Sequence, residues 1–306
     1  MRIAVLGAGA MGMLFGGYLS RKNEVWLVEI SQERVDRINR EGVKIREKEG
    51  DVRLYPRAVT STEGLGTMDL ILVFVKAMFT EEALRNNQHL IGENTCLMTL
   101  QNGAGHDRKL LSFAKPDRII IGTTQHNSSI IENGYIHHGG IGLTSVGLLS
   151  GNSASLLPLA ENFTACGLEC VTCDEIQKQI WTKLFTNTAA SALTAVLQVP
   201  LGFLMENDSA HGIMRQLCHE AVMVANAEGF ARFDEADVLS GVEAVCRNAP
   251  NGYTSIYSDI RAGRRTEVDT ISGSVVAAAK AQGLQVPCHE MLVALIHALE
   301  GKPRMD

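Results

Sequence analysis

Residues 2–12 read RIAVLGAGAMG, an apolar run that leads directly into three glycines. The run at residues 3–6 is short and wholly apolar, so it predicts a buried strand. The glycines follow at G-x-G-x-x-G spacing, and the apolar pattern that continues to Leu19 predicts a helix. A strand, a glycine-rich turn and a helix in this order form the fingerprint of a dinucleotide-binding site.

Each glycine of this fingerprint has its own expected role. Gly7 permits the tight turn, Gly9 lets a pyrophosphate approach the backbone, and Gly12 lets the helix pack close to the strand. The free amide groups and the positive dipole end of the helix then suit the phosphates. The cofactor-binding residues expected in this turn are Gly7, Ala8, Gly9, Ala10, Met11 and Gly12.

A second apolar strand is predicted at residues 24–28, and Glu29 follows it. A carboxylate about 20 positions after the first glycine usually binds the ribose hydroxyls of the cofactor. The alternative is an ordinary glycine-rich turn in which Glu29 is a solvated strand end. The number of conditions that the motif meets together favours a nucleotide site with Glu29 as a cofactor-binding residue.

The composition is typical of a globular protein with two domains of ordinary size. The chain has 306 residues, 45% of them hydrophobic and 20% charged, with a net charge of −6. This charge and the lack of a long basic run argue against nucleic-acid binding, and no apolar run is long enough to span a membrane. The fingerprint begins at residue 3, so we expect no signal peptide.

The seven cysteines indicate free thiols in a reducing, cytoplasmic compartment, because an odd number cannot all pair. Cys170 and Cys173 form a single C-x-x-C motif. A zinc site needs four ligands, and no second pair lies at a suitable spacing. We therefore expect reduced structural cysteines and no metal.

Strand and helix patterns alternate in the first half of the chain, as in a doubly wound sheet. Strands are predicted at residues 71–75, 95–100 and 118–123, and an edge hairpin at 135–138 and 141–146. Helices are predicted at residues 176–195, 208–228, 235–247, 267–282 and 290–299. The expected fold class is α/β, with a Rossmann-type doubly wound domain over residues 1–173 and an all-α domain over residues 174–306.

Two polar residues follow predicted strands of the first domain. Lys76 follows the strand at residues 71–75, and Asn102 follows the strand at 95–100. Ligands of open α/β sheets bind outside the carboxyl ends of the strands, so both residues are candidates for the site. The alternatives are a solvated strand end for Lys76 and simple turn chemistry for the Asn102-Gly103 dipeptide.

A second group of candidates lies in the helical half. Lys183, Asn187 and Ser191 are spaced four apart, so they share one face of a helix. Apolar neighbours such as Trp181 would desolvate Lys183 and lower its pKa towards the range of a general acid. The alternative is a lysine that extends from a surface helix into water.

Thr266 is placed to cap a helix, which would make Glu267 an early helical carboxylate stabilised by the dipole. Helix stabilisation alone is the alternative role for Glu267.

Five motifs occur in order along the chain. They are GAGAMG at residues 7–12, V-K-A at Lys76, L-Q-N-G at Asn102, W-x-K-x-x-x-N from Trp181 to Asn187, and S-x-x-x-D-I-R-x-x-R-x-T-E-x-D from Ser255 to Asp269. Together they resemble the ketopantoate reductase (2-dehydropantoate 2-reductase) family. The first motif is shared by many dehydrogenases, whereas the last two are specific.

The resemblance implies an oxidoreductase that reduces a small 2-keto acid with NAD(P)H. Lys183 would protonate the ketone oxygen, and Glu267 would bind the substrate hydroxyl and orient Lys183. The remaining implied roles are Asn102 beside nicotinamide and substrate, Asn187, Ser191 and Ser255 on substrate polar groups, and Lys76 with Glu267 near the cofactor. The implied partner is the keto acid, with no nucleic acid and no membrane, and a homodimer is left open.

Two positions depart from the family pattern. Ser191 stands where many members have a second asparagine, which leaves more room and fewer donors for the substrate. Glu29 stands where many NADPH-dependent members have a basic residue, and its charge would repel a 2′-phosphate. Arg34 and Ser31 are candidates to bind that phosphate, Arg34 only if it folds back from the next helix. NADH is therefore expected at least as much as NADPH.

Two other functions remain open at this point. One is a D-2-hydroxyacid dehydrogenase that acts on a branched 2-keto acid. The other is a nucleotide-binding sensor without turnover, although a sensor would not need Lys183, Asn187 and Glu267.

Overall fold

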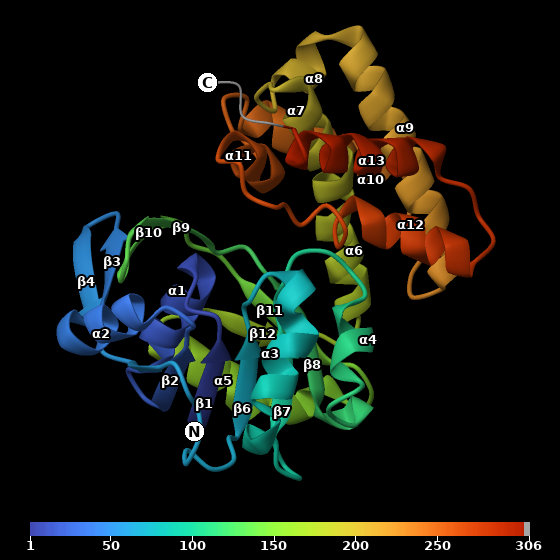
Figure 1. Cartoon of the computed structure of the whole chain (residues 1–306). Coiled ribbons are helices and arrows are strands. Elements are labelled where there is room, and N and C mark those ends of the chain that lie inside the picture. Colours follow the sequence, from blue (N-terminus) through green and yellow to red (C-terminus); the bar gives the residue numbers. More distant parts are fainter. Residues whose placement is uncertain (303–306) are drawn as a thin grey trace. The chain divides into compact units, whose positions relative to one another are not determined.

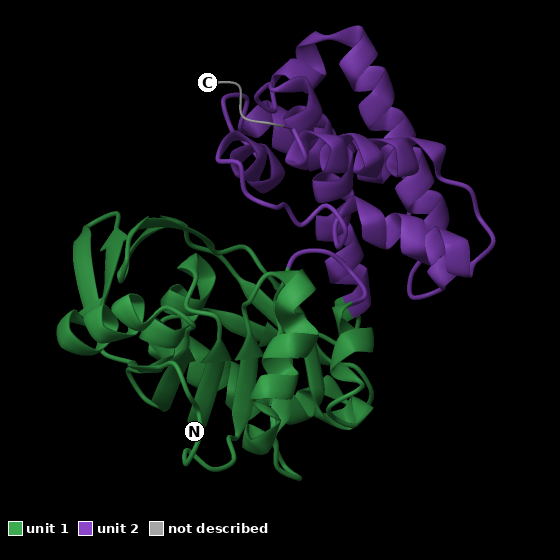
Figure 2. Ribbon diagram, viewed as in Figure 1, with its two compact units in different colours: residues 1–101, 106–176 green, residues 102–105, 177–306 purple. Residues whose placement is uncertain are grey.

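The computed structural model describes residues 1–302, and these form two compact units. The first unit contains residues 1–101 and 106–176, and the second contains residues 102–105 and 177–302 (Figure 2). The short stretch Asn102–Gly105 therefore groups with the helical unit. Among the described residues, no helix is both long and apolar enough to cross a membrane.

The first unit is built on an eight-stranded sheet with the order β12-β11-β8-β7-β6-β1-β2-β5. Its strands are β1 (Arg2–Leu6), β2 (Glu24–Val28), β5 (Arg57–Val59), β6 (Leu70–Val73), β7 (Cys96–Thr99), β8 (Ile119–Thr124), β11 (Thr144–Leu148) and β12 (Cys170–Thr172). All neighbours are parallel except β8 and β11. The central place of β1, with β2 and β6 on its two sides, confirms the doubly wound Rossmann-type fold.

Four α-helices connect the strands up to β8, and a fifth precedes β12 (Figure 1). They are α1 (Ala10–Leu19), α2 (Gln32–Glu41), α3 (Thr80–Asn86), α4 (His106–Leu110) and α5 (Leu157–Cys166). Helix α1 is apolar nearly all round and buried from Gly12 to Leu19. A helix of this kind needs cover on more than one face.

A second sheet supplies that cover, and it corrects one prediction. Its order is β4-β3-β10-β9, with β3 (Val43–Glu47), β4 (Gly50–Leu54), β9 (Asn127–Glu132) and β10 (Tyr135–Gly140). Strands β3, β9 and β10 pack on α1 (Figure 1). The hairpin predicted from residues 135–138 and 141–146 is wrong, because β10 pairs with β9 and β11 pairs with β8. The glycines around the exposed Ile141 carry the chain from one sheet to the other.

A buried polar chain connects this second sheet to α1. The Tyr18 hydroxyl donates to Glu47 at 2.5 Å, and Glu47 contacts His138 Nδ1 at 2.9 Å. His138 Nε2 in turn lies 3.0 Å from His126 Nδ1. Burial, with His138 beside it, lowers the pKa of His126 to about 4, so that ring is neutral near pH 7. The chain fixes the second sheet against α1 by directional bonds.

The second unit is helical. Its elements are α6 (Ile176–Thr186), the π-helix η5 (Asn187–Ser191), α7 (Ala192–Leu197), α8 (Phe203–Glu206), α9 (Asp208–Glu228), α10 (Glu235–Asn248), α11 (Ser255–Arg261), α12 (Ser272–Ala281) and α13 (Pro287–Glu300). The helix predicted at residues 208–228 is confirmed as α9. The Asn207 side chain caps it by accepting from the Ala210 amide at 3.0 Å, and Gly229 ends it with φ 78°. The helix predicted at 267–282 starts at Ser272 instead, so its predicted start is wrong.

Glu220 on α9 caps the start of α13 from outside. Its carboxylate accepts from the Cys288 and His289 amides, both at 3.0 Å, and pairs with the His289 ring at 2.9 Å. Burial opposes ionisation of Glu220, but these hydrogen bonds outweigh it and lower the pKa to about 2. Helix α13 therefore takes its position from α9.

The contact of α1 with β1 gives a first prediction. A Cβ on Gly12 would lie 1.9 Å from the Gly7 carbonyl oxygen, whereas a Cβ on Gly9 would meet no atom of the described chain within 4 Å. We expect Gly12→Ala to lower the free energy of unfolding by about 2 kcal/mol or more, as overpacking does. Gly9→Ala should change it by about 0.5 kcal/mol or less. Urea unfolding of both variants measures the difference, and equal losses would contradict this account of α1.

Candidate active site

The glycine turn between β1 and α1 has the shape expected of a phosphate cradle. Gly7 has φ 100°, and a Cβ there would lie 2.8 Å from the Val75 amide, so only glycine fits. Gly9 caps α1, whose first turn holds no acidic side chain. The helix N-terminus beside Gly9 therefore leaves the space and the amide groups that a pyrophosphate needs. These residues fit a dinucleotide.

Glu29 lies at the predicted ribose end of this site and is 8% exposed. Its Oε1 accepts from the Ile30 amide at 2.9 Å and the Ser31 amide at 3.1 Å. Its Oε2 forms an ion pair of 2.7 Å with Arg34 Nη1. Arg34 therefore folds back from α2, which is the arrangement that a bound 2′-phosphate requires of it.

Asn133 holds Arg34 in this arrangement. Its Oδ1 accepts from Arg34 Nε at 3.2 Å, and its Nδ2 donates to Glu33 at 3.1 Å. Asn133 lies in the turn between β9 and β10, 99 residues from Arg34 in sequence. No local pattern indicates such a contact, so sequence reasoning missed it. The Arg34 guanidinium therefore compensates the negative charge of Glu29 next to the predicted cofactor site.

Gln101 fastens the loop that follows β6. Its Nε2 donates to the Val75 carbonyl at 2.6 Å and to the Thr80 hydroxyl at 3.0 Å. Lys76 lies between these two acceptors, half-buried, immediately before the 3₁₀ helix η1 (Ala77–Phe79). Gln101 was missed as a functional candidate, although a polar residue directly after a buried strand is a recognisable signal.

The loop that carries Asn102 packs on residue 270 of the helical unit. The Ala104 amide donates to the Thr270 carbonyl at 3.2 Å. Gly103 has φ 101°, and a Cβ there would lie 1.8 Å from the same carbonyl oxygen. This loop therefore requires glycine at position 103, and it brings Asn102 close in space to the segment that contains Glu267.

Lys183 has the lowered pKa that the sequence predicts. It lies half-buried on α6 between Trp181 and Leu184, which are 2% and 1% exposed. Burial lowers the pKa of Lys183 to about 8, and the negative charge of Glu267 opposes this shift. A lysine with this pKa is mostly protonated at pH 7 and still gives up its proton readily. Lys183 and Glu267 are thus brought together.

Glu267 lies in a turn and not in the first turn of a helix. Its carbonyl accepts from the Thr270 and Ile271 amides, both at 3.1 Å, and α12 begins only at Ser272. Thr266 is therefore no helix cap; its hydroxyl accepts from the Val268 amide at 3.2 Å. The predicted stabilisation of Glu267 by a helix dipole is wrong, because the tight turn precedes the helix.

The π-helix η5 starts at Asn187, one turn after Lys183, and ends at Ser191. Such wide turns are frequent at functional sites, and the four-residue spacing gave no sign of one. Asn187 is half-buried and Ser191 is buried. The Ser191 carbonyl accepts from the Thr254 hydroxyl at 3.1 Å, and Thr254 caps α11, which begins at Ser255. Thr254, also missed, thus brings Ser191 and Ser255 together.

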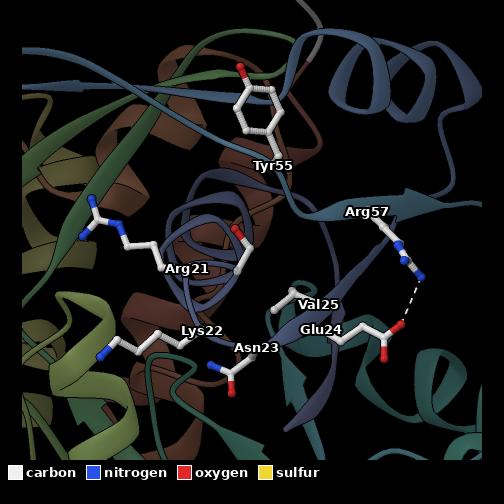
Figure 3. Close-up of a pocket in the computed structure, with 8 residues that line it drawn as sticks. Arg21, Lys22, Asn23, Glu24, Val25, Tyr55 and Arg57 are labelled. Atoms are coloured by element: carbon white, nitrogen blue, oxygen red, sulfur yellow. Dashed lines mark hydrogen bonds and ion pairs between the residues drawn. The ribbon is translucent and has the colours of Figure 1, made fainter.

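A pocket of about 490 Å³ lies elsewhere in the first unit, at the amino end of β2 (Figure 3). It is lined by Ser20, Arg21, Lys22, Asn23, Glu24, Val25, Tyr55 and Arg57. Arg57 and Glu24 pair in it at 3.0 Å. Glu29 follows the opposite end of β2, so this pocket is separate from the predicted cofactor residues.

Comparison with known proteins agrees with this geometry. The family model "Ketopantoate reductase PanE/ApbA" matches residues 3–151, and its C-terminal counterpart matches residues 175–300. The 2-dehydropantoate 2-reductase of Halobacterium salinarum is 30% identical over 97% of this chain and 98% of its own length. The chain belongs to the ketopantoate reductase family. The 2-dehydropantoate 2-reductase of Pyrococcus abyssi is 31% identical over 99% of this chain and 100% of its own length.

Solved structures of this family and of a related dehydrogenase share the fold. D-mandelate dehydrogenase in complex with NADH and anilino(oxo)acetate has a TM-score of 0.91 at 30% identity and covers 98% of both chains. A PanE/ApbA family ketopantoate reductase from Ralstonia eutropha has a TM-score of 0.89 at 28% identity, also with 98% coverage of both. The chain is an oxidoreductase with a nicotinamide cofactor, and the sensor without turnover is set aside.

The burial of Lys183 predicts a gain in stability when its charge is removed. The pKa of Lys183 is about 8, against 10.5 for an ordinary lysine. Keeping the buried side chain protonated at neutral pH therefore lowers the free energy of unfolding by roughly 3 kcal/mol. The unfolded chain binds more protons between these values, so native stability should rise as the pH increases from 8 to 10.5. We expect Lys183→Met to be more stable than the native chain at pH 7 by about 2 kcal/mol.

Chemical unfolding at pH 7 and at pH 10 checks this prediction. The matched control is Lys178→Met, on an exposed position of the same helix. A Lys183→Met chain that is less stable than the native chain at pH 7 would show that burial of the ammonium group does not destabilise the native chain.

Proposed function

We propose that this chain reduces 2-dehydropantoate to D-pantoate with hydride from NAD(P)H, a step of pantothenate biosynthesis. The observation that carries the proposal is the desolvated Lys183 next to Glu267. Both residues stand in motifs of the family to which the chain belongs. A cation beside a developing alkoxide stabilises the transition state of carbonyl reduction.

Lys183 acts as the general acid in this proposal. The reduced nicotinamide, when bound, supplies a hydride to the carbonyl carbon of the keto acid. The Lys183 ammonium gives its proton to the carbonyl oxygen, so that C=O becomes CH–OH and the lysine becomes a neutral amine. Water then returns a proton to the amine. Glu267 binds the substrate hydroxyl and orients Lys183 through their charge interaction.

The other predicted site residues complete this assignment. Residues 1–173 bind the dinucleotide through the glycine turn, Glu29 and Lys76. Residues 174–306 bind the substrate and carry the catalytic residues. Asn102 lies beside nicotinamide and substrate, and the substrate's polar groups are bound by Asn187, Ser191 and Ser255. We also expect a cytoplasmic homodimer, which light scattering of the purified chain tests for its oligomeric state.

A D-2-hydroxyacid dehydrogenase that acts on a branched 2-keto acid is the second candidate. The likeness to D-mandelate dehydrogenase and the hydroxyl of Ser191 in place of an amide favour it. Steady-state kinetics with a panel of 2-keto acids, with and without a 4-hydroxyl group, separates the two. A higher kcat/KM for 2-dehydropantoate than for 2-ketoisovalerate or phenylglyoxylate supports the reductase, and the reverse order supports the second candidate.

Site variants test the residue roles in the same assay. We expect Lys183→Ala to lower kcat by about 10²-fold or more, with cofactor affinity little changed. Glu267→Ala should raise KM for a hydroxyl-bearing keto acid more than for one that lacks the hydroxyl, because a buried partner is lost. Near-normal kcat in Lys183→Ala would refute its role as the acid, and equal losses on both substrates would refute the contact of Glu267 with the hydroxyl.

For the cofactor we propose a modest preference for NADH with retained use of NADPH. Glu29 favours the ribose hydroxyls of NADH, and the Arg34 guanidinium 2.7 Å away offers a cation to a 2′-phosphate. We expect Glu29→Ala to shift kcat/KM towards NADPH, because it removes repulsion and releases Arg34. Arg34→Ala should reduce the use of NADPH more than that of NADH.

The matched control is Arg40→Ala, which removes an exposed arginine from the same helix and should leave the ratio unchanged. The measurement is kcat/KM for each cofactor with one keto acid. A native preference for NADPH above about tenfold, roughly 1.4 kcal/mol, would contradict the proposed preference.

A further inference from the structure

His297, in the last turn of α13, makes contact with two carboxylates. Its Nε2 lies 3.0 Å from Asp269 Oδ1, and its Nδ1 lies 3.0 Å from Glu300 Oε2. A neutral imidazole donates from one nitrogen only, so both contacts are hydrogen bonds only when the ring is the doubly protonated cation. His297 is 40% exposed and therefore open to exchange of its proton with water.

Glu300 extends the same network to Thr266. Its Oε1 accepts from both the amide and the hydroxyl of Thr266, each at 2.7 Å. Thr266 is 1% exposed, and its hydroxyl accepts from the Val268 amide at 3.2 Å. The residues on both sides of Glu267, Thr266 before it and Asp269 after it, are thus tied to one turn of α13.

We propose that His297 and Glu300 are positioning residues that hold the turn of residues 266–269, so that the Glu267 carboxylate stays beside Lys183. The inference rests on the proposed function of Glu267 and adds the residues that fix its place. Neither His297 nor Glu300 lies in a motif that pointed to the site. A small displacement of a group that orients the proton donor lowers turnover without changing the chemistry.

The charges around His297 make the positioning depend on pH. The hydrogen bond to Glu300, followed by the charge and hydrogen bond of Asp269, raises the pKa of His297 above its ordinary value. Arg265, immediately before this turn, is a nearby cation, with its Nη2 3.9 Å from Asp269 Oδ2. Of the helices that pack on α13, α7 has no ionisable residue, α12 has Lys280 in its last turn, and α9 places Glu220 at the other end of α13.

The direction of the pH effect follows from the raised pKa. The cation that ties both carboxylates is present at low pH and is lost as the pH rises through the pKa of His297. Native positioning should therefore weaken on the alkaline side. At the acid end of the range Lys183, with a pKa of about 8, is protonated in the native and the variant chains. At the alkaline end both the native chain and His297→Gln lack the cation at position 297. The ionisation of Lys183 therefore cancels in the ratio of their kcat values at both ends of the range.

The experiment compares kcat of the native chain with that of His297→Gln and Glu300→Gln from about pH 5.5 to 9. This range includes the ordinary histidine pKa of about 6.5 and the higher values expected for His297. We expect each variant to lose about fivefold in kcat at the acid end, with KM for the cofactor unchanged. For His297→Gln the ratio should approach one at the alkaline end. His297→Arg, which keeps a cation between the carboxylates, should restore most of the loss.

The matched control is His219→Gln, which removes an exposed histidine that pairs with Glu235 at 2.8 Å on another helix of the same unit. It should leave kcat unchanged at every pH. A loss in His297→Gln that is the same at every pH would indicate a merely structural role and overturn the inference.

A variant cycle separates this inference from the proposed function. If Glu267→Gln has normal kcat, the proposed role of Glu267 in orienting Lys183 fails, and the inference fails with it. If Glu267→Gln is impaired and His297→Gln is not, only the inference fails. If the inference holds, His297→Gln causes little further loss when added to Glu267→Gln, since the group that it positions is already gone.

Discussion

The position of α1 depends on the space that Gly12 leaves beside the carbonyl oxygen of Gly7, where a Cβ would lie only 1.9 Å away. This close approach places the helix N-terminus directly over the end of β1, where phosphates bind. It also leaves the outer side of an almost wholly apolar helix to be covered, and the second sheet provides that cover. A change at Gly12 therefore affects both the cofactor turn and the packing of the second sheet.

In the second unit, burial changes the acidity of a functional side chain. Its α6 places a lysine among apolar side chains, and the cost of that burial appears as the lowered pKa of Lys183. Replacing the lysine by an apolar residue would benefit the fold, so its presence is explained by chemistry rather than by stability. Glu267 offsets part of the cost, and the turn that carries it is in turn held by α13.

The sequence predicted what depends on neighbouring residues. Alternating patterns located β1, α1, β2 and the capped helix α9, and apolar neighbours of Lys183 predicted its pKa. It did not predict contacts between residues that are far apart in the chain. These are the hydrogen bond of Asn133 with Arg34, that of His297 with Asp269, and the pairing of β3 with β10. The start of α12 was misplaced because Thr266 bonds within a turn that a cap pattern resembles. Local periodicity holds no information about such contacts.

The π-helix at Asn187–Ser191 has a consequence for how such enzymes diverge. A turn of this kind contains one residue more than an α-helical turn, so it can arise by a single codon insertion and revert by a single deletion. Because the wide turn absorbs the added residue, the helical segments before and after it keep their faces, and the change falls on the side chains of the turn itself. Insertion and deletion in this stretch would thus re-aim several polar side chains at once, a larger step in substrate range than one substitution gives. Alignments of relatives that ignore this extra residue would pair the wrong side chains after Asn187.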